Sequence, residues 1–209
     1  AVKPRVIHWM SYLFGVSGYL HWALNQWHIK MGNFSPGDEW ITWPGRYAPH
    51  SSLRYEAQRE GLEDCELFYM LQRANEKAMK ELGLENFDPF TRPRELAAEV
   101  VRSCTEYSKN YDEISAVRAR LLRELCDLHS NPIFISAAEP PAVAPVREGK
   151  VRITGKARKG ATITVNGTPI EVVNGSFSTE VEISEARREI VVCGSLDGKT
   201  SEIVRRYRI

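Results

Sequence analysis

The chain has 209 residues, of which 43% are hydrophobic and 26% charged, and its 28 basic and 27 acidic side chains leave a formal charge of +1. This composition is typical of a folded globular protein of one to three small domains. The near-neutral charge argues against nucleic acid as the main partner, and no apolar run is long enough to predict a membrane span. The cysteines and histidines show no metal-ligand or redox spacing, so no metal and no cofactor is predicted.

The first elements have the order helix then strand. Apolar residues recur at helical spacing over residues 4–16, with Pro4 in the first turn and Gly15 as the stop. Residues 18–27 are then almost entirely apolar and aromatic, which predicts a short strand covered on both faces, with Asn25 and Gln26 at its polar end. A helix that leads into such a strand is the repeat of an α/β fold.

A loop and a long helix follow. Glycines, prolines and alternating aromatics over residues 28–50 predict a long loop with a short β-ribbon. Ser51 or Ser52 is placed to cap a helix whose apolar side chains repeat every 3.6 residues to about Leu82, and Gly83 is placed to end it. The charged residues at its start are expected to form solvated ion pairs such as Arg59 with Glu63.

The second half changes character twice. Two further helices are predicted over residues 92–106 and 111–129, packed as an antiparallel pair, and the proline-rich residues 131–146 predict a semi-rigid linker. From Arg147 onward apolar residues alternate with polar ones in about six short runs. Three turn pairs, Asn166-Gly167, Asn174-Gly175 and Asp197-Gly198, are typical of tight hairpins, so a small antiparallel sandwich is predicted.

The candidate site residues are aromatic. Trp22, Trp27, Trp40 and Trp43 cluster around the end of the predicted strand, where flat indole faces suit the apolar faces of sugar rings. The alternative is that some of them are core or loop-anchoring residues. The amides of Asn25 and Gln26 could bond sugar hydroxyls or stabilise the loop. Asp38 and Glu39 are the nearest acids, but adjacent acids in a turn are poorly placed to face one substrate from opposite sides.

Three motifs carry a family resemblance. Three runs follow one another: GVSGYLHWALNQW, GDEWITWPG and SLRYEAQREGLEDCELFYML. In this order they resemble the end of the bacterial glycoside hydrolase family 123 barrel and its related domain of unknown function, and the resemblance covers residues 5–82. The resemblance implies a (β/α)8 catalytic domain that removes N-acetylhexosamine, using an Asp-Glu pair and the substrate acetamido group. That pair lies upstream in the family, and no residue here matches it. Trp22, Asn25 and Trp27 carry over as substrate contacts, whereas Cys65 replaces an aromatic of the family motif.

The predicted fold class is therefore α and β multidomain. We expect the last helix-strand-helix units of a (β/α)8 barrel over residues 1–82, a helical extension over 83–130, a linker over 131–146 and an antiparallel sandwich over 147–209 that resembles bacterial immunoglobulin-like accessory domains. Because the barrel would be incomplete, its remainder is an expected partner, and the apolar faces of Trp9, Leu20 and Leu24 should be exposed.

The expected function is that of the C-terminal part of a glycoside hydrolase. The glycan would contact Trp22, Asn25, Trp27, Trp40 and Trp43, the location would be extracytoplasmic, and the chain alone should not hydrolyse glycosides. The alternative is a non-catalytic carbohydrate-binding or cell-surface interaction module. The sandwich, whose aromatics are Phe177 and Tyr207, is expected to act as a spacer.

Overall fold

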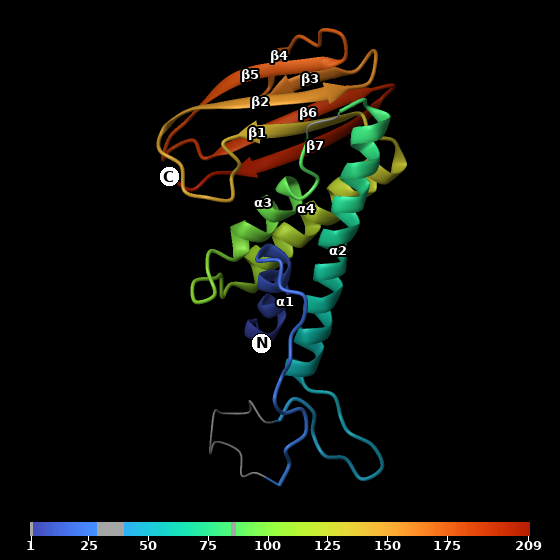
Figure 1. Cartoon of the computed structure of the whole chain (residues 1–209), viewed down its shortest axis with the longest axis vertical. Coiled ribbons are helices and arrows are strands. Elements are labelled where there is room, and N and C mark those ends of the chain that lie inside the picture. The colour runs from blue at the N-terminus through green and yellow to red at the C-terminus, as the bar shows by residue number, and fades with distance from the viewer. Residues whose placement is uncertain (1, 29–39, 85–86) are drawn as a thin grey trace. The chain divides into compact units, whose positions relative to one another are not determined.

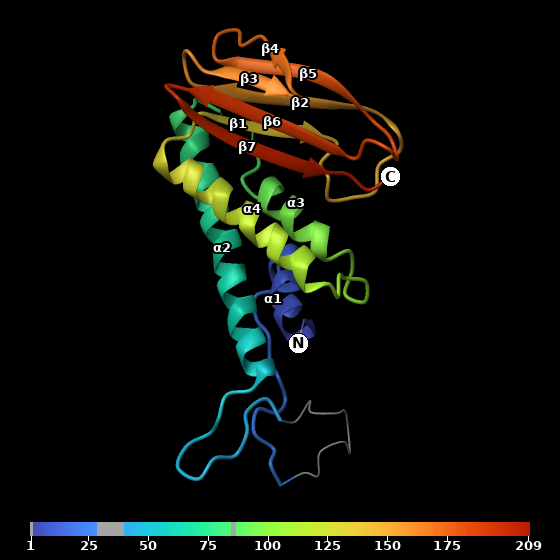
Figure 2. The ribbon, with the colours of Figure 1, turned by 180° about the vertical axis from the view of Figure 1, so that it is seen from behind.

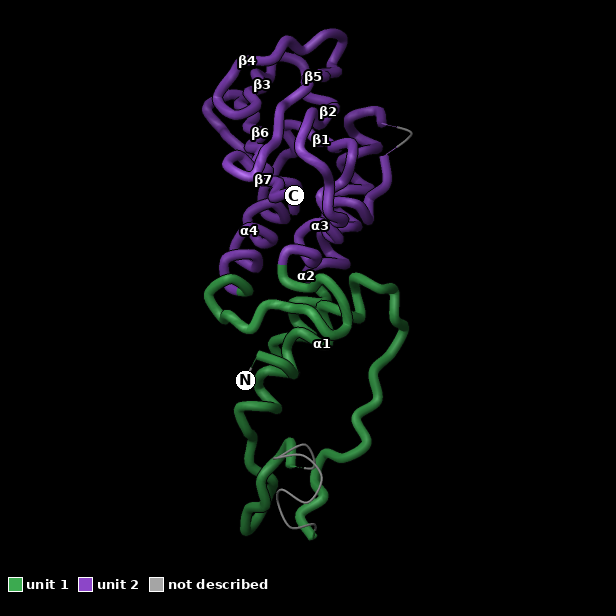
Figure 3. The backbone as a smooth tube through the Cα atoms, turned by 90° about the vertical axis from the view of Figure 1, so that its left-hand side faces the viewer, with its two compact units in different colours: residues 1–66, 100–114 green, residues 67–99, 115–209 purple. Residues whose placement is uncertain are grey.

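The computed structural model describes residues 2–28, 40–84 and 87–209. The chain forms two compact units, one of residues 1–66 and 100–114 and the other of residues 67–99 and 115–209, which we call unit 1 and unit 2 (Figure 3). The helices α2 (Leu53–Glu81), α3 (Thr91–Val100) and α4 (Tyr111–Ser130) each contribute to both. No described helix is both long enough and apolar enough to cross a membrane.

Unit 1 contains α1 (Lys3–Leu13), whose Val6, Trp9 and Tyr12 are buried. Gly61 of α2 lets α1 approach closely, because a Cβ atom at this position would lie 2.4 Å from the Arg5 carbonyl oxygen. The expectation that Trp9 is exposed is wrong: this side chain is 0% exposed. It lies on the face of α1 that packs within unit 1 and needs no further strand to cover it.

The strand predicted over residues 18–27 is not present. The segment is irregular, and Leu20 and Leu24 are 91% and 49% exposed, as expected for these two residues. An apolar run becomes a buried strand only when neighbouring strands form hydrogen bonds with its backbone groups and other elements cover its faces. The part of the chain that the structure describes offers it a single bridge, from Asn25 to Trp40. Residues 18–27 therefore do not form a barrel strand in this structure.

The long helix α2 has the predicted ends. The Ser52 hydroxyl accepts hydrogen bonds from the backbone N–H groups of Arg54 and Tyr55, both at 3.1 Å, which is an N-cap. Gly83 follows the last turn with φ +67°, a conformation that favours glycine.

The helix predicted over residues 92–106 is shorter than expected, whereas the helix predicted over residues 111–129 is confirmed. The α3 helix ends at Val100 because the Ser103 hydroxyl accepts from the N–H groups of Thr105 and Glu106, which forms a turn in place of further helix. The α4 helix runs antiparallel to α3, since Arg92 pairs with Glu124 near one end.

The C-terminal half of unit 2 is a sandwich of two antiparallel sheets (Figures 1 and 2). All three predicted hairpin turns are confirmed, because Asn166, Asn174 and Asp197 and the glycine after each have positive φ. One sheet has the order β1-β2-β5 and the other β4-β3-β6-β7. The strands are β1 (Phe134–Glu139), β2 (Gly149–Ala157), β3 (Thr162–Val165), β4 (Thr168–Ile170), β5 (Ser176–Ile183), β6 (Glu189–Leu196) and β7 (Lys199–Arg206).

Strand β1 corrects one prediction, because it lies in the segment expected to be a linker. The prolines of that segment flank Phe134–Glu139, so all six residues keep their N–H groups and pair with β2 at the sheet edge. Phe134 packs edge-on against Phe177, with ring centroids 6.3 Å apart. Phe177 and Tyr207 are both buried, so neither offers a flat sugar-binding face.

Candidate functional site

The predicted aromatic residues lie on two paired segments of unit 1. The Leu24 carbonyl oxygen accepts from the N–H groups of Ile41 and Thr42 at 3.0 and 3.1 Å, and Trp27 Nε1 donates to the Thr42 carbonyl oxygen at 2.8 Å. Ala23 and Ile41 are 3% exposed and form the buried side of this pairing. The segments around residues 24 and 41, far apart in sequence, are thus held together by backbone bonds.

A short hairpin extends this region. Trp43 and His50 exchange backbone hydrogen bonds of 2.8 and 2.9 Å. Gly45 is required within it, since a Cβ atom there would lie 2.2 Å from the Ala48 carbonyl oxygen. Ser52, the N-cap of α2, also donates its hydroxyl to the Ile41 carbonyl oxygen. The rigid start of α2 therefore anchors the loop that carries Trp40 and Trp43.

These contacts bring four of the five predicted site residues together. Asn25 is bridged to Trp40, and the Trp40 and Trp43 rings meet edge-to-face with centroids 5.3 Å apart. Trp27 and Trp40 are half-buried, whereas Trp43 is 38% exposed. Trp22 precedes the paired segment and is 51% exposed. We call Trp22, Asn25, Trp27, Trp40 and Trp43 the aromatic surface.

The nearby carboxylates are held in ion pairs. On the exposed start of α2, Arg59 pairs with Glu56 at 2.9 Å and with Glu63 at 2.5 Å, as expected for solvated pairs. The Ser51 hydroxyl and then Arg59 lower the pKa of Glu56. Asp38 and Glu39 lie outside the described residues. This arrangement offers no carboxyl pair set on two sides of a substrate among the residues described here.

One acid of this helix is buried, which the sequence analysis missed. Asp64 is 0% exposed and accepts from Arg5 Nε at 2.6 Å, from Arg5 Nη2 at 3.2 Å and from Trp9 Nε1 at 2.9 Å. Arg5 also donates to Glu60 at 2.9 Å. Burial alone would lower the pKa of Arg5, but these carboxylates outweigh it and raise the pKa. The bonds lock α1 onto α2 within unit 1 and leave Asp64 no access to substrate.

A signal for this burial exists in the sequence. Asp64 falls on the same helical stripe as Ala57, Gly61, Phe68 and Leu71, all of which are buried. A charged residue on a buried stripe needs a partner of opposite charge from another element.

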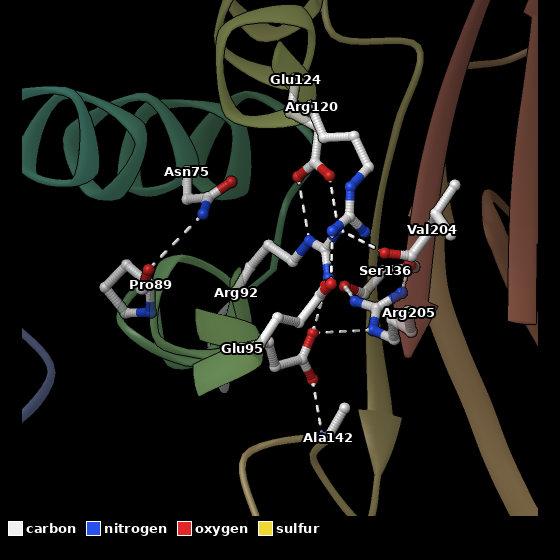
Figure 4. Close-up of polar contacts among 11 residues, drawn as sticks. Asn75, Pro89, Arg92, Glu95, Arg120, Glu124, Ser136, Ala142, Val204 and Arg205 are labelled. Carbon is white, nitrogen blue, oxygen red and sulfur yellow. Dashed lines mark hydrogen bonds and ion pairs between the residues drawn. The ribbon is translucent and has the colours of Figure 1, made fainter. Parts of the chain in front are cut away.

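Unit 2 contains a second buried charge network, shown in Figure 4. Arg92 donates to Glu124 through Nε at 2.9 Å and through Nη2, to Glu95 at 3.0 Å and to the Val204 carbonyl oxygen at 2.7 Å. Arg205 of β7 donates to Glu95 at 3.1 Å and to the hydroxyl and carbonyl oxygens of Ser136 at 3.0 and 2.8 Å.

The two arginines and two glutamates balance in charge. Burial would lower the pKa of Arg92, but Glu124 and Glu95 raise it. The network also satisfies backbone groups at the free edges of β1 and β7, which are the edge strands of the two sheets. It ties α3 and α4 to the sandwich.

The described residues contain no candidate metal site. No group of three or more His, Cys, Asp or Glu side chains is placed there to hold a metal ion. The four cysteines are free thiols. His8 is buried, which lowers its pKa.

The comparisons with known proteins concern the N-terminal part of the chain. Residues 1–71 match the family model described as the glycoside hydrolase 123 catalytic domain. The matched segment includes α1, the whole aromatic surface and the first part of α2. No curated protein and no solved structure matches the chain.

The N-terminal third is therefore related to a glycoside hydrolase catalytic domain. Residues 72–209, which include most of unit 2, lie outside the match.

Proposed function

We propose that this chain supplies the C-terminal part of a glycoside hydrolase family 123 type catalytic domain, with the aromatic surface as a wall of its substrate pocket. The observation that carries the proposal is that the family match over residues 1–71 contains all five residues of the aromatic surface. The substrate class is glycans that contain N-acetylhexosamine, as the resemblance implies. The catalytic Asp-Glu pair would come from a segment outside residues 1–209.

The shape of the aromatic surface supports sugar binding. Trp22 and Trp43 each expose a large part of an indole, and the exposed side chain of Asn25 adds a donor and an acceptor. Indole faces bury the apolar face of a sugar ring, whereas amides bond its hydroxyl groups. The bonds of Trp27 and Ser52 hold the loop in place before a ligand arrives.

An exposed apolar segment over residues 14–24 supports the proposal that another part of the catalytic domain packs against this chain. Several large apolar side chains in residues 14–24 are exposed, among them Leu20 and Leu24. Contiguous apolar exposure of this kind marks an interaction surface. We propose that further strand-helix units of the catalytic domain cover it, and that residues 18–27 become a strand when those neighbours are present. The same proposal includes an extracytoplasmic location, because glycans that contain N-acetylhexosamine occur there.

A non-catalytic carbohydrate-binding module is the second candidate. It is favoured by the exposed tryptophans together with the ion-paired state of Glu56 and Glu63, since such a surface can bind a sugar without cleaving it. The sandwich would act as an immunoglobulin-like spacer in either case, because Phe177 and Tyr207 are buried.

Binding and turnover together test the proposal. An oligosaccharide of N-acetylgalactosamine is titrated into the chain while intrinsic tryptophan fluorescence is recorded, and hydrolysis of a chromogenic N-acetylgalactosaminide is followed in parallel. We expect saturable binding without turnover, and binding weakened about tenfold or more by Trp43→Ala, since loss of one aromatic stacking contact costs on the order of 1–3 kcal/mol. Phe90→Ala is the matched control, because Phe90 in unit 2 is also 38% exposed.

Three outcomes separate the candidates. Binding that Trp43→Ala and Phe90→Ala weaken equally, or no binding at all, contradicts a sugar site at the aromatic surface. Turnover by the chain alone contradicts the proposal that the catalytic pair lies elsewhere. Tight binding that gains no turnover when the remaining catalytic domain is added favours the binding module.

A further inference from the structure

Unit 2 contains a cavity of about 220 Å³ that the proposed function does not use. It lies between the edge strands β1 and β7 and side chains of α2, α3 and α4. Its lining includes every residue from 132 to 139, and so the whole of β1. Because successive side chains of a strand point to opposite faces, a cavity lined by consecutive residues runs along the edge of the strand. This edge of β1 is free, since β1 pairs only with β2.

Alternate residues of β1 point their backbone groups to this edge. The Arg158 N–H, just past the end of β2, donates to the Ile133 carbonyl oxygen at 2.9 Å, so residue 133 bonds on the β2 side. Because such bonds alternate along an antiparallel ladder, Phe134 points its N–H and C=O away from β2, as do the second and fourth residues after it. The Ser136 carbonyl oxygen agrees, because it accepts from Arg205 of β7 at 2.8 Å.

Phe134 offers a pairing site one residue long. None of the residues that the structure describes forms a hydrogen bond to its edge-facing N–H and C=O groups. Phe134 is 3% exposed, and backbone polar groups that are buried this deeply are nearly always bonded. At Ser136 the edge is closed, because Arg205 donates to both the hydroxyl and the carbonyl oxygen (Figure 4). A long added strand is therefore excluded.

Apolar side chains form the wall next to this pairing site. Ile135 packs with Met79 of α2 in a cluster that Phe87 and Leu128 also join. All four residues line the cavity. A buried cavity of about 150 Å³ accommodates benzene, so this one has room for a ligand with a short apolar body as well as polar groups.

The charged groups of the lining favour a ligand without charge. The two arginines of the lining pair with Glu95 and Glu124. Asp127 is faced by Arg123 and accepts from the Glu202 backbone N–H. The other acidic side chains of the lining are exposed to solvent: Asp88, Glu139 and Glu202. A charged head group would lose its hydration here without gaining a dedicated partner among the described lining residues.

We propose that the cavity binds a small uncharged ligand that carries peptide-like N–H and C=O groups on an apolar body. The ligand would pair with Phe134 as one residue of a neighbouring antiparallel strand does, so that each partner donates one N–H to the other's carbonyl oxygen. Its apolar side chain would pack against Met79 and Leu128.

A matched set of three probes tests the pairing and the charge requirement. N-acetyl-leucinamide, N-acetyl-N-methyl-leucinamide and N-acetyl-leucinate are each titrated into the whole chain by calorimetry. We expect N-acetyl-leucinamide to bind. The N-methyl analogue lacks the donor to the Phe134 carbonyl oxygen and should bind about fivefold more weakly, as expected for the loss of one hydrogen bond. The carboxylate should bind at least about tenfold more weakly. Equal affinity for N-acetyl-leucinamide and either analogue, or no binding of N-acetyl-leucinamide, overturns the proposal.

Amide chemical shifts locate the ligand. On titration with N-acetyl-leucinamide the Phe134 amide signal should shift most, because its N–H gains an acceptor. Glu180 of β5 is the matched control. The Ala157 N–H donates to the Gly175 carbonyl oxygen, so by the same alternation the Glu180 N–H points to the opposite free edge of this sheet, outside the cavity lining. Equal shifts for Phe134 and Glu180 overturn the assignment, whatever any variant shows.

A pair of variants on α4 gives an independent check. Leu128→Trp should abolish binding of N-acetyl-leucinamide by filling the cavity. Leu122→Trp introduces the same side chain at an exposed position of the same helix, outside the lining, and should leave binding unchanged. Circular dichroism checks that both variants are folded. Unchanged binding by folded Leu128→Trp overturns the proposal.

Discussion

The buried ion pair of unit 1 permits a sharp prediction about stability. Asp64→Ala would remove the acceptor of two Arg5 hydrogen bonds and of the Trp9 indole N–H. Arg5 and Asp64 have side-chain exposures of 3% and 0%, so solvent screens the pair little. Breaking a buried pair from one side costs about 3–5 kcal/mol, and a buried N–H left without an acceptor costs about 1–3 kcal/mol more. We expect a loss near the lower end of this range, about 4 kcal/mol, because Glu60 remains as a partial partner for Arg5.

Urea unfolding followed by tryptophan fluorescence measures this loss. The matched control is Glu63→Ala, one position earlier on α2, where the carboxylate forms an exposed ion pair that contributes little. The double variant Arg5→Met, Asp64→Leu should be more stable than Asp64→Ala, because it leaves no buried charge unpaired. Equal urea midpoints for Asp64→Ala and Glu63→Ala would refute the reasoning.

Three further predictions concern unit 1. Gly61→Ala should destabilise the chain by more than about 1 kcal/mol in the same urea assay, although alanine favours helix, because its Cβ would lie 2.4 Å from the Arg5 carbonyl oxygen; unchanged or raised stability would show that α1 does not pack there. His8 has a pKa lowered by burial from its ordinary 6.5, so the unfolded state binds its proton more readily. Stability should therefore fall as the pH drops below about 6.5, and His8→Leu should flatten this slope; an equal slope in both proteins contradicts the assignment. Leu20→Ser should reduce concentration-dependent association in sedimentation, because Leu20 is 91% exposed, and an unchanged profile would argue against an apolar interaction surface.

Local signals in the sequence were reliable. The Asn-Gly and Asp-Gly turns required positive φ, which few residue pairs provide, so the hairpins of the sandwich followed from the sequence. Ser52 and Gly83 likewise marked the two ends of α2 by hydrogen-bonding and backbone chemistry that lies within one or two turns.

Features that depend on distant partners were missed. The run 18–27 has the composition of a buried strand, yet a strand needs neighbours that the sequence pattern cannot guarantee. The Trp9 indole N–H donates to Asp64 across 55 positions, and both side chains are buried. The Arg205 side chain reaches Glu95 across 110 positions. Periodicity identifies a face of an element, but it does not say which element covers that face.

The candidate site was predicted in part. The clustering of the tryptophans in sequence became proximity in space for Trp27, Trp40 and Trp43, because backbone bonds at Leu24 and Thr42 pair their segments. Whether these residues bind a sugar stays a prediction. The cavity of unit 2 left no sequence signal, since its lining comes from β1, β7 and three helices.

The indole N–H resonances provide the most direct test of the central claim, that the aromatic surface binds a glycan. The chain has five tryptophans, of which four lie in the aromatic surface. The fifth, Trp9 of α1, is fully buried and serves as an internal control. Titration with an N-acetylgalactosamine oligosaccharide should shift the signals of Trp22 and Trp43 most and leave that of Trp9 unchanged. Five unmoved signals at saturating sugar, or equal shifts that include Trp9, would contradict the account.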